Sequence, residues 1–313
     1  MKNIYVGLLI IMAGFNVFAQ NATNVKFEFS GDQIVVYYDL PRSVIKSFWV
    51  DLFISTDNKA TWIHLTKVTG DVGPSMKSGL KKKIIWDRFV EGIELRGKFD
   101  FLVFTEPDIF DGLDAGRFID RRDGISYKWK RLGNQIWMIQ NLNTGYGIEG
   151  SVQSMENNLI EKYCYNNDPG KCDVYGGLYQ WDEATQYSTV KINQGICPKH
   201  WHIPDSLEWE NLISFLGGPY YAYGNMKELG NNHWIQKTKG TTNLSRFTVL
   251  PGGLKDSDTA DSFVGLNNQA RFWTSTENDT ASAKAVGLNN QLLQVYFFSG
   301  LKSDAYSVRC VRD

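Results

Sequence analysis

Residues 195–204 read GICPKHWHIP and lead directly into Asp205 and Ser206. Cys197 follows a predicted strand or loop, and Trp201 close to Pro204 indicates packing in a core. Asp205 or Ser206 can cap a helix that has an acidic residue in its first turn and an apolar stripe along one face. Those helix residues are Glu208, Leu207, Leu212, Ile213 and Phe215. The stretch therefore predicts a packed connection that enters a helix, and the Gly-Gly-Pro at 217–219 ends that helix.

The sequence on either side of this stretch predicts an α+β domain. Upstream, residues 127–130 and 135–139 flank a Gly133-Asn134 turn and read as a hairpin. A further helix is expected at 181–187, and the chain after Gly230 reads as loops and short strands. Helices that precede strands within one domain are typical of the α+β class.

Residues 22–105 read as short strands separated by turns. Val25, Phe27 and Phe29 alternate with polar residues, and 34–38 and 83–86 are rich in β-branched and aromatic side chains. This pattern predicts an antiparallel β-sandwich, of a size that suits an immunoglobulin or fibronectin type III-like module. In addition, residues 55–62, 70–73 and 85–87 resemble small β-sandwich modules at the N-termini of secreted Bacteroidetes proteins.

The expected organisation has four parts. Residues 1–19 form a signal peptide and residues 20–106 the β-sandwich domain. Residues 107–117, which contain Pro, Gly and acidic residues, form a linker, and residues 118–313 form the second domain.

The signal peptide is expected because a weakly basic start precedes a short apolar run. Val17 and Ala19 then supply small or tolerated residues before a cleavage site. The run is shorter than the ~20 residues that a membrane-spanning helix needs, and no later stretch is long and apolar enough to span a bilayer. The sequence thus predicts an exported protein that is secreted, or held at the outer surface or in the periplasm.

Charge and aromatic content narrow the class of partner. The formal net charge is -1, and the lysines at 81–83 are the only basic cluster, so no basic face is expected that could neutralise nucleic-acid phosphates. Aromatic residues make up 14% of the chain, with 10 Trp and 15 Tyr. That content fits either an aromatic-rich core or a surface that stacks on sugars or peptides.

All four cysteines lie in the second half of the chain, at Cys164, Cys172, Cys197 and Cys310. In an exported protein an even count predicts disulfides, and four cysteines allow three pairings. Cys164 with Cys172 is preferred because both lie in one short loop. The remaining pair, Cys197 with Cys310, would then close nearly the whole domain.

A series of short motifs carries a family resemblance. They are DG at 123–124, GNQIWM at 133–138, NL at 141–142, YGGLYQW at 175–181, GICPKHWHIP at 195–204, EW at 208–209, LPGG at 250–253, FWTSTE at 272–277 and SVRCVR at 307–312. In this order they resemble the Fibrobacter succinogenes major paralogous domain over about residues 118–313. The resemblance implies a bacterial, extracytoplasmic protein with a fold similar to C-type lectin-like and formylglycine-generating-enzyme-like domains. It implies no activity, and Thr274 and His200 depart from residues that are frequent in the family.

The sequence supplies no catalytic or metal-binding set. His200 and His202 lack a supporting Cys or carboxylate, and Ser275 and Ser307 lack triad partners at recognisable positions. No cofactor is expected. Calcium binding is the alternative left open, because alternating carboxylates in one loop can hold a calcium ion. Those carboxylates are Asp256, Asp258 and Asp261. A redox or copper thiol pair, as in formylglycine-generating enzymes, is the enzymatic alternative for the cysteines.

Ligand-binding residues are expected in the loops around 219–236, 255–268 and 276–294. The aromatic stretch after the Gly-Gly-Pro either forms an exposed loop that binds ligand or packs inward. The candidates are Tyr220, Tyr221, Tyr223, Trp234, Asp256, Asp258, Asn278 and Tyr296.

The leading functional hypothesis is a non-catalytic binding or adhesion protein of the cell surface or the medium. The lectin-like domain would present its loops to a glycan or protein ligand, and the sandwich would serve as a spacer or anchor. The alternatives are an enzyme related by fold to formylglycine-generating oxidases or to a glycan-processing activity, and a structural component of a surface assembly.

Overall fold

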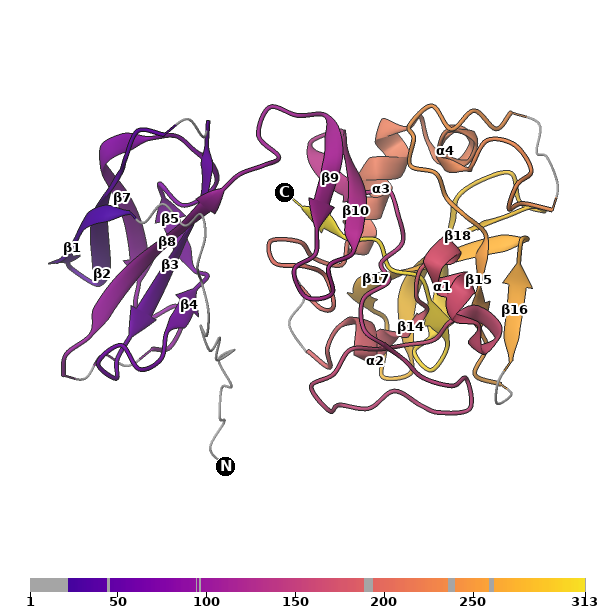
Figure 1. Ribbon diagram of the computed structural model, residues 1–313. Helices are drawn as coiled ribbons and strands as arrows, with labels where there is room; N and C mark the ends of the chain where they lie inside the picture. The colour runs from indigo at the N-terminus through magenta and orange to yellow at the C-terminus, as the bar shows by residue number, and fades with distance from the viewer. Residues whose placement is uncertain are drawn as a thin grey trace. The chain divides into compact units, whose positions relative to one another are not determined.

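The computed structural model describes residues 22–43, 46–93, 95, 97–188, 194–235, 240–258 and 262–312 (Figure 1). Its contacts divide the chain into two compact units, with the division between Gly112 and Leu113. Each unit is described by itself below. The expected signal peptide at 1–19 lies outside the described residues.

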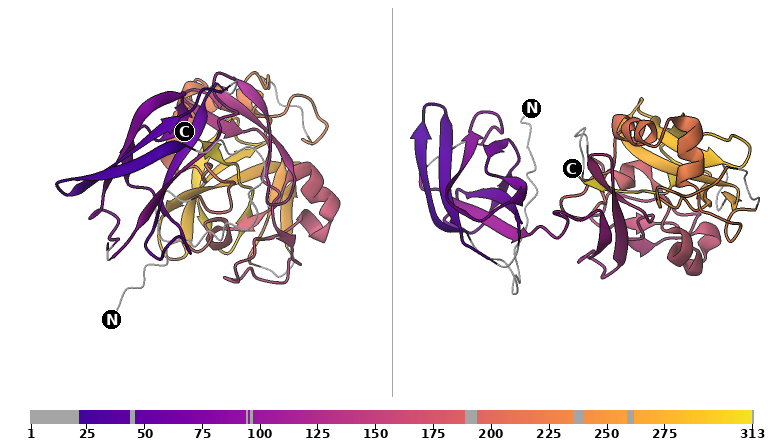
Figure 2. Two further views of the ribbon diagram at one scale, coloured as in Figure 1. Left: turned by 60° about the vertical axis from the view of Figure 1, so that its left-hand side comes forward. Right: turned by 90° about the horizontal axis from the view of Figure 1, so that it is seen from above.

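The first unit consists of two antiparallel sheets, visible as two layers of strands in Figure 2. One sheet has the order β1-β2-β7-β5, with bounds Thr23–Ser30, Gln33–Leu40, Gly79–Asp87 and Val68–Gly70. In the other, β3 pairs with β8 along its full length and with β4 and β6 over shorter stretches. The bounds of this second sheet are Phe48–Ser55 (β3), Ile63–Leu65 (β4), Gly73–Met76 (β6) and Asp100–Pro107 (β8).

A single core joins these two sheets. Ile34 and Val36 of β2 are fully buried, and so are Val50 and Leu52 of β3 and Trp86 of β7. Alternate residues of a strand point to the same face, so each sheet contributes one apolar face to the space between the layers. The antiparallel β-sandwich expected from the strand pattern is therefore what residues 22–107 form.

The segment expected to be a linker, 107–117, belongs to regular structure only at its two ends. It contains the last residue of β8 and the first residues of β9 (Ala115–Ile119). β9 pairs with β10 of the second unit, and the amide of Arg131 donates to the carbonyl of Asp114. Backbone hydrogen bonds thus tie residues from Asp114 onward to the second unit.

The second unit contains three sheets. A four-stranded sheet has the order β21-β11-β10-β9, where β10, β11 and β21 span Ser126–Leu132, Gln135–Met138 and Val311–Arg312. The largest sheet has seven strands in the order β14-β20-β15-β17-β18-β19, with β16 on β15. Their bounds are Tyr179–Gln180, Ala305–Tyr306, Gly252–Lys255, Gln269–Glu277, Ser282–Asn289, Tyr296–Leu301 and, for β16, Phe263–Leu266. A small parallel pair consists of β12 (Tyr146–Gly147) and β13 (Glu161–Lys162).

The helices of this unit precede most of its strands, as the sequence predicts. They are the 3₁₀ turn η1 (Tyr165–Asn167) and the α-helices α1 (Pro169–Tyr175), α2 (Trp181–Ala184), α3 (Ser206–Phe215) and α4 (Pro219–Met226). The hairpin predicted around Gly133-Asn134 is present as β10 and β11.

The helix predicted after the GICPKHWHIP stretch is α3, and its start follows from its first residues. The Asp205 carboxylate accepts from the Glu208 amide at 2.8 Å, and the Glu208 carboxylate accepts from the Asp205 amide at 2.8 Å. This reciprocal capping box satisfies two amides that the first turn leaves without an intrahelical partner. Trp209, Leu212 and Ile213 form the buried face.

Of the two alternatives for the aromatic stretch, the exposed loop does not form, because residues 220–223 belong to a helix. Gly217 and Gly218 both have positive φ angles, which stops α3, and Pro219 then occupies the first turn of α4. Ala222, Tyr223 and Met226 lie on the buried face of this helix. Together α3 and α4 pack over β17 and β18, where Phe272 and Val286 belong to the same core cluster (Figure 1).

Both disulfides pair as preferred from the sequence. Cys164 is bonded to Cys172, and Cys197 is bonded to Cys310 across 113 positions of sequence. Next to Cys310, β21 pairs with β11, and His202 exchanges backbone hydrogen bonds with Val311. The last residues of the chain are thereby fixed against the opening hairpin and the 195–204 stretch.

The protein therefore belongs to the α+β class, is rich in strands and contains several antiparallel sheets. Among the described residues, no helix has the length and apolar character required to cross a bilayer.

Candidate functional site

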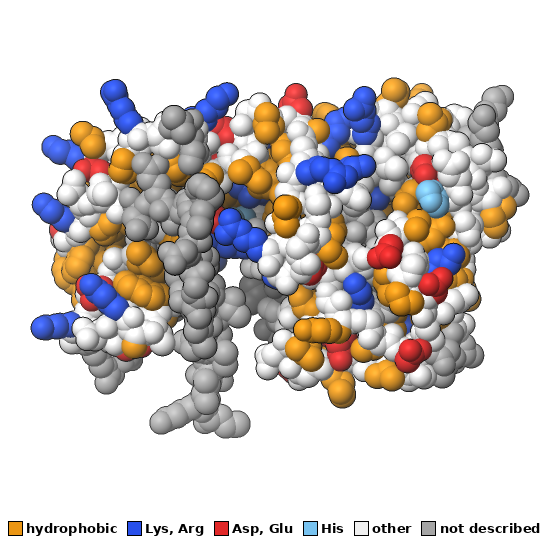
Figure 3. Space-filling view, viewed as in Figure 1, with side chains coloured by type: hydrophobic (Ala, Val, Ile, Leu, Met, Phe, Trp, Pro, Cys, Tyr) orange, Lys and Arg blue, Asp and Glu red, His pale blue; other side chains and the backbone are white. Residues whose placement is uncertain are grey.

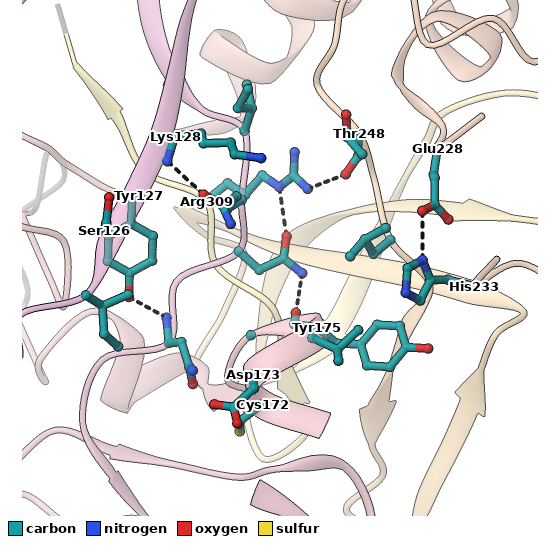
Figure 4. Close-up of a pocket in the computed structure, with 18 of the residues that line it drawn as sticks. Ser126, Tyr127, Lys128, Cys172, Asp173, Tyr175, Glu228, His233, Thr248 and Arg309 are labelled. Carbon is teal, nitrogen blue, oxygen red and sulfur yellow. Dashed lines mark hydrogen bonds and ion pairs between the residues drawn. The ribbon is translucent and has the colours of Figure 1, made fainter. Parts of the chain in front are cut away.

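The second unit contains a groove of about 600 Å³, called here the Arg309 groove after the residue in its floor (Figure 4). This volume lies within the ~300–1,000 Å³ typical of small-molecule sites. Its walls come from five stretches of chain: β10, the residues after β11, α1, the 228–250 region and the segment just before β21 that contains Arg309. The lining residues are Ile125, Ser126, Tyr127, Lys128, Ile139, Gln140, Asn141, Asn143, Cys172, Asp173, Val174, Tyr175, Gly176, Glu228, His233, Asn243, Arg246, Thr248, Leu250 and Arg309.

Arg309 is held in the floor by hydrogen bonds to three residues of two other segments. Its Nε donates to Asn141 Oδ1 at 2.8 Å, and its Nη2 donates to the Thr248 carbonyl at 3.0 Å. Its Nη1 donates to the Phe247 carbonyl, and the guanidinium lies 4.3 Å from the centroid of the Phe247 ring. The planar guanidinium suits such a site because it donates in several fixed directions at once.

The hydrogen-bond partners of the Arg309 guanidinium are neutral groups. Within the described part of the chain, its hydrogen-bond partners are an amide oxygen and two carbonyls, and it forms no ion pair with a carboxylate. Burial lowers the pKa of Arg309 to about 9, because the charged form loses its hydration. That value still lies above neutral pH, so a buried positive charge stands beneath the groove.

Asn141 connects Arg309 by hydrogen bonds to the end of α1 and to Ser307. Its Nδ2 donates to the Tyr175 carbonyl at 2.7 Å and to Ser307 Oγ at 3.2 Å. The neighbouring residue Leu142 donates its amide to the Val308 carbonyl and accepts from the Gly177 amide, both at 2.9 Å. These bonds join the residues after β11, the end of α1 and the segment before β21 into the floor of the groove.

The Cys164–Cys172 disulfide positions α1 along the groove. Cys172 lies in α1 and lines the groove, and its covalent bond ties the helix to the segment before it. Asp168 caps the helix by accepting from the Gly170 amide at 2.9 Å. Asp173, Val174 and Tyr175 of the same helix therefore face the groove in a fixed arrangement.

A histidine–carboxylate pair forms the wall opposite Arg309 and Lys128 in Figure 4. His233 Nδ1 lies 2.7 Å from Glu228 Oε1, and the Tyr175 ring packs edge-on against the imidazole at 5.6 Å between centroids. Because a carboxylate accepts, the neutral imidazole carries its proton on Nδ1, which leaves Nε2 as an acceptor. Glu228 Oε2 is buried and has no hydrogen-bond partner among the described residues.

The aromatic candidates lie away from the Arg309 groove. Tyr220 and Tyr221 are 65% and 67% exposed on α4, and their rings make an edge-to-face contact with each other. Tyr223 and Trp234 are 3% and 1% exposed. The expectation that these two rings lie on the surface is therefore wrong, because they pack into the core over β17 and β18.

A buried lysine accounts for part of that packing. Lys227 Nζ lies 4.1 Å from the centroid of the Trp234 ring and donates to Tyr223 Oη at 3.1 Å. A cation over an indole face is favourable when both are desolvated, so the ring faces are occupied within the protein.

The remaining candidates occupy separate surface positions. Asp256 Oδ1 accepts from the Asp258 amide at 3.0 Å, which is the geometry of an Asx turn. Asn278 is exposed and donates to Ser299 Oγ at 2.8 Å, while Tyr296 is half-buried and accepts from Asn289 Nδ2 at 3.0 Å. Asp261, the third carboxylate of the calcium expectation, lies outside the described residues.

The described residues contain no group of three or more His, Cys, Asp or Glu that could hold a metal ion. His202 Nε2 lies 2.8 Å from Glu208 Oε1, so it contributes to the start of α3. Since Asp261 lies outside the described residues, calcium binding by the 256–261 loop stays a prediction.

Sequence reasoning missed the residues of the Arg309 groove. Arg309 and Asn141 both lie inside family motifs, SVRCVR and the NL that follows GNQIWM, and the motif was read for its cysteine alone. A charged residue beside a buried cysteine was the available signal, because an arginine in a last, buried strand needs several partners. Glu228 and His233 gave no comparable signal, as they come together only through the loop after α4.

The comparisons with known proteins give one family and no individual relative. The family described as Fibrobacter succinogenes major domain matches residues 131–312. No curated protein and no solved structure matches the chain. The matched residues span from the end of β10 to β21 and include both disulfides and most of the groove lining, with residues 125–128 outside the match. Because the match covers more than half of the chain, this protein belongs to the Fibrobacter succinogenes major domain family.

Proposed function

We propose that this chain is an exported, non-catalytic binding protein that takes a glycan or a protein segment into the Arg309 groove. The second unit, with a fold similar to C-type lectin-like domains, would bind the ligand, and the first unit would act as a spacer or anchor. The protein would be secreted or held at the outer surface or in the periplasm, after cleavage of residues 1–19.

The groove itself carries the proposal. Its floor is fixed by the hydrogen bonds of Arg309 and Asn141 and by two disulfides, so its shape is set before a ligand arrives. A preformed site avoids the entropic cost of ordering loops on binding. Most lining side chains are polar, and convergent polar groups in a concave site are typical of specific ligand recognition.

The state of the cysteines supports binding over thiol chemistry. All four sulfurs are in disulfides and no cysteine is free. An oxidase of the formylglycine-generating kind would need reduced, reactive thiols at its substrate site. Among the described residues, His233 has no hydrogen bond to a hydroxyl or thiol that could serve as a nucleophile.

The charge distribution disfavours nucleic acid as the partner. The whole chain has a formal net charge of -1, and on the face shown in Figure 3 the Lys and Arg side chains are dispersed among acidic and uncharged ones. Binding to a phosphate backbone needs a continuous basic surface.

A pair of matched tryptophan substitutions tests the proposal. Val174 lines the groove and is 45% exposed, whereas Leu207 of α3 is 59% exposed and lies outside it. On glycan and protein arrays, Val174→Trp should abolish binding by filling the groove, and Leu207→Trp should bind like the parent. Binding that survives Val174→Trp, or catalytic turnover of an array ligand, would contradict the proposal.

Export is tested separately by N-terminal sequencing of protein recovered from cell fractions. A mature chain that begins at Gln20 outside the cytoplasm is expected. An uncleaved chain retained in the cytoplasm would contradict this part of the proposal.

A further inference from the structure

The cations around the Arg309 groove lack ion-pair partners among the described residues. Lys128 and Arg246 are exposed at its rim, and Arg309 lies in its floor. Within the described residues, none of these three cations forms an ion pair with a carboxylate. Two carboxylates also line the groove, Asp173 and Glu228, so three cations less two carboxylates leave one net positive charge. The groove is thus positive in a chain whose formal net charge is -1.

The uncommitted polar groups of the lining are mostly donors. Gln140 uses its Oε1 to accept from the Lys128 amide, and Asn143 uses its Oδ1 to accept from Lys162 Nζ. Their Nε2 and Nδ2 groups have no partner among the described residues, and neither do the Lys128 and Arg246 head groups. A ligand that fits must therefore offer acceptors, and charged acceptors satisfy such donors best.

The side-chain amide oxygens of the lining are committed to the protein. Asn141 Oδ1 is bound to Arg309, and Asn243 Oδ1 accepts from the Thr248 amide at 3.1 Å. Glu228 Oε1 is bound to His233, whereas Glu228 Oε2 is buried and has no partner among the described residues. Amide and cationic donors beside these few remaining acceptors match a ligand that carries hydroxyl groups as well as negative charge.

We infer that the Arg309 groove binds a carboxylate-bearing glycan, a chain that contains uronic acid units. This inference rests on the proposed binding function and specifies the class of ligand. Lys128 and Arg246 would bind the sugar carboxylate at the rim, and the buried charge of Arg309 would add a favourable field from below. Gln140, Asn143 and His233 would bind ring and hydroxyl oxygens. A glycan is favoured over a peptide because the uncommitted groups suit hydroxyls, and few apolar side chains of the lining are exposed to receive peptide side chains.

Calorimetry with defined oligosaccharides tests the inference on the full exported chain. The probes are short oligomers of galacturonate, glucuronate and mannuronate, each beside its methyl ester, and a neutral glucose oligomer of equal length. At least one uronate oligomer should bind at low salt, its methyl ester should bind at least about tenfold more weakly, and added salt should weaken binding.

Charge-removing variants locate the bound carboxylate. Lys128→Ala and Arg246→Ala should each weaken uronate binding by about tenfold, which corresponds to ~1.4 kcal/mol. Lys284→Ala is the matched control, because Lys284 is a half-exposed cation of β18 that does not line the groove. It should leave binding unchanged.

The outcomes separate this inference from the proposed function. Equal binding of a uronate oligomer and its ester, or equal losses in Lys284→Ala and Lys128→Ala, overturns the carboxylate assignment. If Val174→Trp abolishes binding of the neutral oligomer, the proposed function stands and the inference fails. Binding of a peptide through its terminal carboxylate, with no uronate binding, also overturns it. If no oligosaccharide and no array ligand binds, both fail.

Discussion

Arg309 Nε donates to Asn141 Oδ1 at 2.8 Å, and this bond joins residues that stand 168 positions apart in the sequence. Asn141 is 9% exposed and Arg309 is 1% exposed, so the bond is shielded from water. Hydrogen bonds of a buried charged donor are stronger than exposed neutral ones, and their loss leaves groups that water cannot satisfy. The pair therefore determines both the stability of the second unit and the position of the groove floor.

A double-mutant cycle measures this coupling. Arg309→Met and Asn141→Ala should each destabilise the protein, by about 1–3 kcal/mol for every buried partner left without a hydrogen bond. Because the two side chains share a hydrogen bond, the double variant should lose less free energy of unfolding than the sum of the two single-variant losses. The difference should be ~0.5–3 kcal/mol in urea unfolding. Arg309→Met combined with Ile54→Val of the first unit is the control, and should be additive. Additive losses in the Arg309–Asn141 cycle would show that the two residues act independently.

Removal of the disulfides should affect stability unequally. Cys197 and Cys310 enclose 113 positions, whereas Cys164 and Cys172 enclose 8. In the chain-entropy model the longer loop restricts the unfolded chain more, by about 5 kcal/mol against about 2.5 kcal/mol. Cys197→Ala with Cys310→Ala should therefore lower the unfolding midpoint more than Cys164→Ala with Cys172→Ala. Equal shifts, measured by thermal or urea unfolding, would argue that enclosed loop length does not govern the effect.

The acid limb of the stability profile should depend on Glu208. Burial by itself raises the pKa of Glu208, but hydrogen bonds from His202, the Asp205 amide and Gln135 lower the pKa overall. A carboxylate with a depressed folded-state pKa stabilises the protein above its unfolded pKa of about 4.3, and this stabilisation is lost as pH falls through the folded value.

Glu208→Gln should therefore be less stable than the parent near neutral pH, and the difference should shrink as pH falls below about 4. Urea unfolding across this pH range measures it. Glu210→Gln is the matched control, since Glu210 is exposed two residues further along α3, and should change stability little. A constant difference between parent and Glu208→Gln at every pH would rule out ionisation of Glu208 as its cause.

Both the positive φ angle and the close packing at position 176 should require glycine. Gly176 has a φ of +80°, and an added Cβ would lie 2.6 Å from Asn141 Cβ and 2.9 Å from the Leu142 carbonyl oxygen. Gly218 has a similar φ of +89°, but an added Cβ would meet no atom within 4 Å. Gly218→Ala should cost roughly 1–2 kcal/mol from the backbone alone, and Gly176→Ala should cost more and weaken ligand binding. Similar losses in both variants would exclude the contact with Asn141 as a cause.

Much of the fold could be predicted because its signals are local. The alternation of Val25, Phe27 and Phe29 and the turn at Gly133-Asn134 each depend on a few adjacent residues, and the strands they predict are present. The capping pair of Asp205 and Glu208 also acts within one turn, and α3 begins where it indicates. Such signals are independent of distant contacts.

Prediction was weaker where burial decides the role of a residue. Tyr220, Tyr221 and Tyr223 are neighbours in one aromatic stretch, yet the first two are exposed and the third is buried. Their helical spacing around α4 separates them, and the helix itself depends on Pro219 after two glycines with positive φ. From the sequence alone the stretch either formed an exposed loop or packed inward, and neither alternative separated the three rings.

The sequence by itself predicted the strands of the sandwich, the opening hairpin and α3 of the second unit, favoured the cysteine pairing that forms, and contained the family motifs, since each depends on residue type and spacing along the chain. Only the tertiary structure decided that Arg309, Asn141, Glu228 and His233 surround one groove, and that Tyr223 and Trp234 do not reach the surface. The physical reason is that burial and unpaired charge are properties of contacts between distant segments. Which cations line a site, and which partners they meet there, follows only from how the chain folds.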